Sequence, residues 1–177
     1  MRAGQDNSDA YCVEPAGSGD LPGILDILNH HILTHHCVFD TEPWSLKQKE
    51  AWFDAFATDG PYRLLVARAG HDILGYAHSS RWRPKSAYDV TAETTVYVST
   101  DYQSGGIGRA LMQKLLHGLP GTGLHSAVAG IAQPGPASNR LHESLGFKKI
   151  GTYRQVGYKF KRFWDVRWYQ KSLVEQS

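Results

Sequence analysis

The chain has 177 residues, a length that suits one domain and buries roughly two-thirds of the surface that the unfolded chain exposes. Hydrophobic residues make up 41% and charged residues 20% of the sequence, and 19 basic against 17 acidic side chains give a net charge of +2. That charge is too small to favour a polyanion as partner. No apolar run approaches the roughly 18 residues of a membrane span. The composition therefore excludes a membrane protein, a collagen, a disulfide scaffold and a disordered tail.

The N-terminal segment and the cysteines bear on location. Residues 1–10, MRAGQDNSDA, are polar and lack the apolar segment of a secretory signal. We expect a flexible N-terminus over 1–10 and a single domain over 11–177. Cys12 and Cys37 are the only cysteines. They are too few for a disulfide framework, which together with the missing signal favours a reducing cytoplasm.

Hydrophobic spacing and turn residues predict the elements in chain order. Residues 11–15 are expected to form a short strand, Asp20 to cap a helix over 21–36, and Ser45 to cap a second helix. Strands follow at 62–68 and 73–80, then a loop at 82–89 and a strand at 91–99. The chain continues with a helix after a glycine-rich stretch, a strand at 126–132, a short helix at 137–145, and strands at 147–155 and 158–173. Because strands outnumber helices and both hairpin and crossover connections occur, the expected fold class is α/β (α+β), a mixed sheet with helices on both faces.

The strongest local pattern is a strand, a glycine-rich turn and an amphipathic helix within residues 94–116. The turn reads Gln103-Ser104-Gly105-Gly106-Ile107-Gly108-Arg109. A loop that opens a helix presents unpaired backbone N–H groups and the positive end of the helix dipole. It therefore indicates a phosphate or pyrophosphate site, to which Arg109 adds a charge. A tight strand-to-helix turn explains the glycines equally well, and neither the P-loop nor the dinucleotide fingerprint is present.

Several motifs together resemble a known family. Gln103-x-x-Gly106-x-Gly108 is similar to the loop of the GCN5-related N-acetyltransferases (GNAT) that holds the pyrophosphate of acetyl-coenzyme A. Further motifs resemble the phosphinothricin and methionine sulfoximine acetyltransferase branch of that superfamily. They are Asn29-His30, Phe39-Asp40-Thr41-Glu42-Pro43-Trp44, Ala87-Tyr88, Glu93-x-x-Val96-Tyr97-Val98, Leu141-His142-Glu143-x-x-Gly146-Phe147, Val156-Gly157-Tyr158-Lys159 and Trp164-Asp165-Val166. The resemblance spans residues 13–173 and implies a mixed, mostly antiparallel central sheet flanked by helices on both faces.

The resemblance also implies that acetyl-CoA binds as a co-substrate, without a metal. Backbone groups of Val96, Tyr97 and Val98 would orient the pantetheine arm and the thioester carbonyl. The other implied contacts are Gln103, Ser104, Gly105, Gly106, Ile107, Gly108, Arg109, Ser138 and Ser144. Relatives often have Asn where this chain has Gly135. A contact to the pantetheine arm is then lost unless Asn139 compensates.

Glu93 is the candidate base. Alternation along the strand 91–99 puts Glu93, Thr95 and Tyr97 on one face. An acceptor amine is an ammonium near neutral pH and must lose a proton before it attacks a thioester, so a nearby carboxylate is useful. The resemblance implies the same role beside the acceptor. The alternative is a solvated glutamate on an exposed strand face.

His142 is the second catalytic candidate. It follows Ser138 by four residues on the predicted short helix and therefore shares its face. The resemblance places it beside the sulfur of acetyl-CoA, where it would protonate the departing thiolate or help to deprotonate the amine. The alternative is an exposed helix histidine.

The resemblance implies an acceptor that is a small amino acid with a tetrahedral oxyanion or sulfoximine head. Arg83 and Lys85 lie in the matching substrate loop and would bind the α-carboxylate, arginine in a bidentate manner and lysine as a point charge. Phe39, Tyr88 and Tyr97 would form the walls of the pocket. The alternatives are a solvated pair of loop cations and ordinary core aromatic residues.

Two other patterns are weaker. His31 and His35 stand four residues apart on a helix, as zinc ligands do, but the H-E-x-x-H motif is absent and no third ligand is evident. No metal is therefore expected.

The tail over 158–168 mixes basic and aromatic residues, as single-strand nucleic-acid platforms do. Alternation instead places Tyr158, Phe160, Trp164 and Trp168 largely on one strand face, as in a core or dimer strand. We expect no nucleic-acid or membrane partner, and the resemblance implies a homodimer.

The expected function is transfer of the acetyl group of acetyl-CoA to the α-amino group of a small amino-acid analogue such as phosphinothricin or methionine sulfoximine. The amine would attack directly in a ternary complex, because neither cysteine lies in a nucleophile motif. Alternatives are the same chemistry on arsinothricin, methionine sulfone or another small amine, and a non-catalytic acyl-CoA-binding sensor.

Overall fold

The computed structural model describes residues 11–103 and 105–174 of the chain. The predicted flexible segment 1–10 and the predicted coenzyme contact Ser104 lie outside these residues. No helix in the described ranges is long and apolar enough to cross a membrane.

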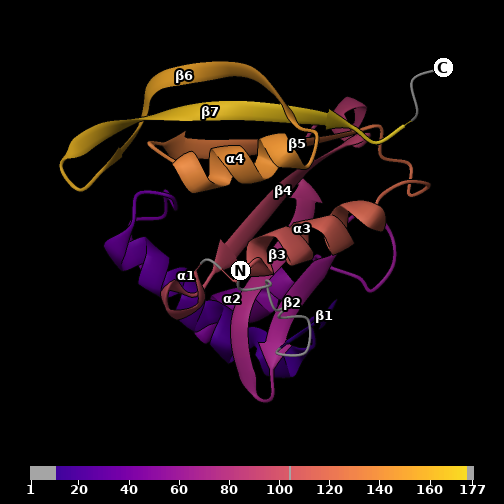
Figure 1. Cartoon of the computed structure of the whole chain (residues 1–177), viewed down its shortest axis with the longest axis vertical. Helices are drawn as coiled ribbons and strands as arrows, with labels where there is room; N and C mark the ends of the chain where they lie inside the picture. The colour runs from indigo at the N-terminus through magenta and orange to yellow at the C-terminus, as the bar shows by residue number, and fades with distance from the viewer. Residues whose placement is uncertain (1–10, 104, 175–177) are drawn as a thin grey trace, which may run out of the picture.

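A seven-stranded sheet runs through the molecule in the order β1-β2-β3-β4-β5-β7-β6 (Figure 1). The strands are β1 (Cys12–Pro15), β2 (Leu64–Ala69), β3 (Asp72–Arg81), β4 (Thr91–Val98), β5 (Ser126–Gln133), β6 (Lys148–Lys159) and β7 (Arg162–Ser172). Only β4 and β5 pair in parallel, and the other neighbours are antiparallel. The expected mixed, mostly antiparallel sheet is therefore confirmed.

Helices cover both faces of this sheet, as expected. They are α1 (Leu21–Thr34), α2 (Leu46–Phe53), α3 (Ile107–His117) and α4 (Pro136–Ser144), with short 3₁₀ turns η2 (Ser18–Asp20), η3 (Ser86–Tyr88) and η4 (Thr100–Tyr102). On β2, Leu64 and Val66 pack with α1, whereas Leu65 and Ala67 pack with α3. This alternation follows from the period of two in a strand and gives the molecule two apolar layers.

The parallel pair separates early. The register of β4 with β5 covers only Thr91–Glu93 against Ser126–Val128 in the described part of the chain. Figure 1 shows the two strands diverging beyond these residues. Backbone groups on the β5 side of the rest of β4 are therefore not used by β5. This split is the feature that positions the site.

The predicted N-cap position of Asp20 is confirmed, because this residue directly precedes α1, but its side chain makes no capping hydrogen bond. Its buried carboxylate instead accepts a hydrogen bond from the Gly17 backbone N–H at 2.8 Å and pairs with Arg68 on β2. The carboxylate of Asp20 therefore binds the guanidinium group of Arg68 on β2 and not the N–H groups at the start of α1.

The last two strands are also divided differently. The chain reverses at Phe160 and Lys161, which both have positive φ, and not near residue 156. Tyr158 and Trp164 therefore belong to different strands of a hairpin: Tyr158 is 59% exposed and Trp164 8%. The predicted shared face of the aromatic residues is wrong for this reason.

Candidate active site

The glycine-rich turn lies where β4 leads through η4 into α3. Gly106 has φ of +76° and precedes the first residue of α3, a conformation that glycine adopts without strain. Gly108 is close to the side chains of Val98 and Leu141, since a Cβ there would lie 3.5 and 3.7 Å from them. The turn thus brings the N-terminus of α3 next to both β4 and α4. Its first N–H groups have no helical acceptor and can hold an anion.

Arg109 links the two helices of this region. Its Nη1 donates to Oγ of Ser144 at 2.8 Å, and that hydroxyl donates to the backbone oxygen of Leu141. Gln103 is extended and exposed beside the turn. Three elements, β4, α3 with its preceding loop, and α4, thus meet at the split between β4 and β5. They carry the predicted coenzyme contacts Val96, Val98, Ser138, Ser144 and the described residues of the loop.

The side chains of β4 divide between the two faces as predicted. Val96 and Val98 pack with α3, and Tyr97 packs with α1. The end of the strand is held by a residue that the sequence did not single out for this purpose: His31 on α1 donates from Nε2 to the backbone oxygen of Val98 at 2.9 Å. No local sequence signal could find this contact, because its partners are 67 residues apart.

Glu93 is paired in register with Val128 at the point where the strands separate. It is not on an open surface: burial raises the pKa of its carboxyl group, and the charge of Arg83 opposes this rise. A carboxylate with a raised pKa is a better proton acceptor than an ordinary glutamate.

His142 is buried, with 3% of its surface exposed, so the exposed helix histidine is excluded. Its Nδ1 lies 2.8 Å from the backbone oxygen of Ser138, which can only accept, so Nδ1 carries the proton. Nε2 has no partner among the described residues. Burial lowers the pKa of this imidazole. It is therefore neutral near pH 7, with a free lone pair on Nε2.

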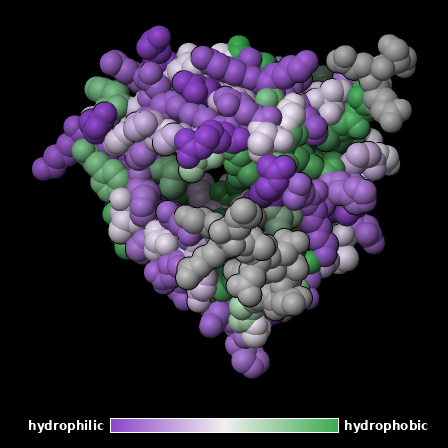
Figure 2. All heavy atoms as spheres, viewed as in Figure 1, coloured by the Kyte–Doolittle hydropathy of each residue, from purple (hydrophilic) through white to green (hydrophobic). Residues whose placement is uncertain are grey.

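The two candidates lie on opposite faces of the sheet. Glu93 shares a face with Val128 and with Trp168, which pairs with Gly130 further along β5. His142 packs against Tyr169, the next residue of β7, whose side chain points to the other face. The split between β4 and β5 opens the sheet from one of these faces to the other. Figure 2, viewed from the side of α3 and α4, shows a hollow with hydrophobic residues in its walls.

Of the predicted acceptor residues with a charge, Arg83 acts on Glu93 electrostatically. Phe39 and Tyr88 are 38% and 41% exposed, so they are not ordinary core residues. Arg83 stacks over Trp82 with 5.1 Å from its guanidinium carbon to the ring centroid. Lys85 stands exposed just before η3, and its charge does not contribute to the pKa shift of Glu93.

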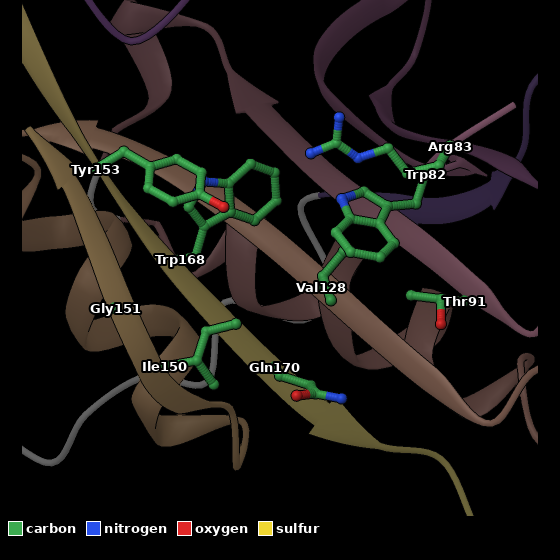
Figure 3. Close-up of a pocket in the computed structure, with 9 residues that line it drawn as sticks. All are labelled: Trp82, Arg83, Thr91, Val128, Ile150, Gly151, Tyr153, Trp168 and Gln170. Carbon is green, nitrogen blue, oxygen red and sulfur yellow. The ribbon is translucent and has the colours of Figure 1, made fainter. Parts of the chain in front are cut away.

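A pocket of about 240 Å³ opens on the Glu93 face (Figure 3). Its lining residues are Trp82, Arg83, Thr91, Val128, Ile150, Gly151, Tyr153, Trp168 and Gln170. Thr91 is two residues before Glu93 on the same side of β4, so the pocket adjoins the candidate base. In Figure 3 the rings of Trp82, Trp168 and Tyr153 come from three different parts of the chain and face the same space. Sequence reasoning missed this pocket, because the pairing of β6 with β7 brings Tyr153 to Trp168, and only the order of the strands across the sheet brings Trp82 to the same ring.

Gly135 has a local structural reason. A Cβ at this position would lie 2.8 Å from both the backbone oxygen of Ala132 and Cγ2 of Ile131, so a side chain does not fit without movement. The amide of Asn139 is engaged in two hydrogen bonds with Gln133, at 3.0 and 3.1 Å. Asn139 therefore does not replace a side chain at residue 135 in this arrangement.

The histidines of α1 do not form a metal site. Over residues 11–103 and 105–174, no group of three or more His, Cys, Asp or Glu side chains is placed to hold a metal ion. The ring of His31 is instead used in the bond to Val98. Cys12 and Cys37 are both free thiols.

Known proteins are similar to this chain in sequence and in fold. The sequence profile of the acetyltransferase (GNAT) family matches residues 29–147. A phosphinothricin N-acetyltransferase of Streptomyces coelicolor is 46% identical over 163 residues, which cover 91% of this chain and 95% of that protein. An L-methionine sulfoximine/L-methionine sulfone acetyltransferase of Pseudomonas paraeruginosa is 38% identical over 161 residues, which cover 91% and 94%. A GNAT superfamily phosphinothricin acetyltransferase from Sinorhizobium meliloti, solved in complex with AcCoA, matches with a TM-score of 0.89 and 27% identity over 95% of this chain and 91% of that one. The family that the motifs resemble is thereby confirmed: the chain belongs to the acetyltransferase (GNAT) family.

Proposed function

We propose that this enzyme transfers the acetyl group of acetyl-CoA to the α-amino group of a small amino-acid analogue such as phosphinothricin or methionine sulfoximine. The names of the two curated relatives and the AcCoA complex of the structural neighbour support this assignment. The observation that carries it is the placement of Glu93 and His142 on opposite faces beside the split between β4 and β5.

The position of each element favours a binding role for the residues that it carries, with the coenzyme on one face and the acceptor on the other. The N–H groups at the start of α3, with Arg109, would hold the pyrophosphate, and Ser138 and Ser144 of α4 would contact the coenzyme beside it. The backbone of Val96, Tyr97 and Val98 that β5 leaves unpaired would bind the pantetheine arm. On the other face, Arg83 and Lys85 would attract the acceptor's carboxylate, and Phe39, Tyr88 and Tyr97 would enclose its apolar part.

The proton steps follow from the protonation states. An acceptor ammonium group loses two protons on becoming an amide, and the departing thiolate takes up one, so the site must remove one proton and relay the other. Glu93 would accept the first proton, because partial burial raises the pKa of its carboxyl group. His142 would accept the second proton on Nε2 and pass it to the departing thiolate. The Nδ1–H tautomer favours this relay over a histidine that begins as the acid.

The finer assignments concern assembly and location. β6 is the edge of the sheet, and four of its residues expose large apolar side chains, Ile150, Tyr153, Val156 and Tyr158, at 56 to 59%. An exposed apolar edge favours self-association, so we assign a homodimer through β6, testable by light scattering after size exclusion. A single domain over 11–177, a cytoplasmic location and no nucleic-acid partner complete the proposal.

The test is thiol release from acetyl-CoA with phosphinothricin, methionine sulfoximine, methionine sulfone, arsinothricin and polyamines as acceptors. Saturable turnover on one of the amino-acid analogues is expected. Glu93→Gln should lower kcat by about 10² to 10³-fold and leave the affinity for acetyl-CoA within about twofold. Coenzyme binding without turnover on any acceptor would point to the acyl-CoA sensor, and full activity of Glu93→Gln would remove this residue from the mechanism.

A further inference from the structure

The segment between α1 and α2 that carries Phe39 is fastened to the β6–β7 hairpin. Lys159, the last residue of β6, donates from Nζ to the backbone oxygens of His35 at 3.0 Å and Val38 at 2.6 Å, 124 and 121 residues away in the sequence. In Figure 1 the segment after α1 rises toward the turn between β6 and β7. Lys159 is a buried cation, with 5% of its surface exposed.

The buried ammonium group of Lys159 depends on the backbone segment that surrounds it. Within residues 11–103 and 105–174 Lys159 forms no ion pair with a carboxylate. A buried ammonium is unfavourable unless other groups replace the hydrogen bonds of water. Two backbone oxygens of one segment do so here. The cation can therefore stay buried only while that segment keeps its place.

Phe39 is seated by the same strand. Gly157 is buried on the same face of β6 as Lys159, two residues earlier. A Cβ at Gly157 would lie 2.3 Å from Cε2 of Phe39. The ring therefore packs directly on the strand backbone, in space that any other residue at 157 would fill.

Trp164 and His36 reinforce the contact. Nε1 of Trp164 donates to the backbone oxygen of Lys159 at 2.9 Å, and the ring of His36 stacks on Trp164 with centroids 4.1 Å apart. His36 also donates from Nε2 to the backbone oxygen of Pro134 at 2.9 Å. The hairpin thus holds the segment on both sides of Val38.

We propose that Lys159 is a positioning residue for the acceptor: by holding the backbone at His35 and Val38, it seats Phe39 on Gly157 and so shapes the acceptor side of the site. The inference rests on the proposed function for the identity of the acceptor. Lys159 acts through Phe39: within the described part of the chain its ammonium group donates to the segment at His35 and Val38 and not to α3.

The kinetic test compares Lys159→Met with Lys161→Met, a matched control at an exposed position of the hairpin turn. The Lys159 variant should raise the KM for the acceptor about fivefold or more, and the KM for acetyl-CoA should stay within about twofold. The control should leave both constants within about twofold of the wild type. Equal increases in both KM values, or no increase, would overturn the proposal.

A double variant separates positioning from a general structural role. If Lys159 acts through Phe39, then Phe39→Ala combined with Lys159→Met should raise the acceptor KM no further than Phe39→Ala alone. Additive effects would contradict this. If Lys159→Met does not fold, Gly157→Ala displaces Phe39 with the ammonium in place and should give the same split between the two KM values. A wild-type acceptor KM in Gly157→Ala would then count against the proposal.

Hydrogen exchange of the full chain gives a readout that needs no substrate. Amides of residues 35–40 should exchange about tenfold faster in Lys159→Met, with those of α3 unchanged. If the wild type turns over none of the acceptors, the proposed function fails, but this exchange result still decides whether Lys159 holds the segment. Unchanged exchange at 35–40 would refute the inference.

Discussion

His31 on α1 and Val98 on β4 are joined by a hydrogen bond from Nε2 of the histidine to the strand's last backbone oxygen, at 2.9 Å. The histidine is 6% exposed, and burial is the main reason that its pKa is lowered. The neutral ring of His31 donates from Nε2 to the Val98 carbonyl group, which lies beyond the part of β4 that pairs with β5. The helix on the acceptor side thereby fixes the strand end that leads into the glycine-rich turn.

His31→Leu is expected to affect the coenzyme side. It removes the donor and leaves the Val98 oxygen without its partner, so the free energy of unfolding should fall by about 1–3 kcal/mol. The KM for acetyl-CoA should rise about fivefold to tenfold, because the backbone of residues 96–98 loses its anchor. Urea unfolding and steady-state kinetics measure both. His30→Leu, on an exposed position of the same helix, is the control, and identical behaviour of the two variants would show that the bond to Val98 is unimportant.

The pH dependence of kcat/KM should report Glu93. Burial raises the pKa of this carboxyl group, whereas the positive charge of Arg83 favours the ionised form and lowers it. The active, ionised form appears as pH rises through that pKa. Arg83→Gln removes the cation, so the acid limb should move to higher pH. Lys85→Gln is a suitable control because Lys85 is not a cause of the shift, and movement of the limb in the opposite direction in Arg83→Gln would contradict the coupling.

The tautomer of His142 can be observed directly. The hydrogen bond to the Ser138 oxygen requires a proton on Nδ1, and burial disfavours the imidazolium. Nitrogen NMR of ¹⁵N-labelled protein at pH 7 should therefore show a protonated Nδ1 and an unprotonated Nε2 for this residue. His142→Ala supplies the assignment by loss of the signal. An Nε2–H tautomer or an imidazolium at pH 7 would rule out the proposed relay.

His78 should make the protein less stable in acid. Burial lowers its pKa from the ordinary 6.5 to about 3. Below pH 6.5 the unfolded chain binds a proton that the folded protein does not, so the free energy of unfolding falls as pH decreases from 6.5 toward 3. One such group contributes about 1.4 kcal/mol per pH unit. His78→Phe should flatten the curve by this amount in urea unfolding between pH 6 and 4, and the exposed His71→Gln should not; equal slopes for all three proteins would disprove this.

Local patterns predicted much of the site. The glycine-rich turn, the first turn of α3 and the shared face of Glu93 and Tyr97 each depend on residues close together in the sequence, where periodicity and turn chemistry decide. The same is true of Ser138 and His142, one helical turn apart. Asp20 shows the limit, because an arginine 48 residues away takes the carboxylate that local reasoning gave to a helix cap.

The sequence by itself determined the family, the order of helices and strands, and the residue types that the chemistry needs. Only the tertiary structure decided how far β4 and β5 stay paired, that His31 anchors Val98, that Trp82 and Trp168 line one pocket, and that Lys159 holds the segment of Phe39. These relationships join elements far apart in the chain and depend on strand register and on the turn at Phe160 and Lys161. A change of register by one residue would send every side chain of a strand to the opposite face, so periodicity within a single segment cannot specify them.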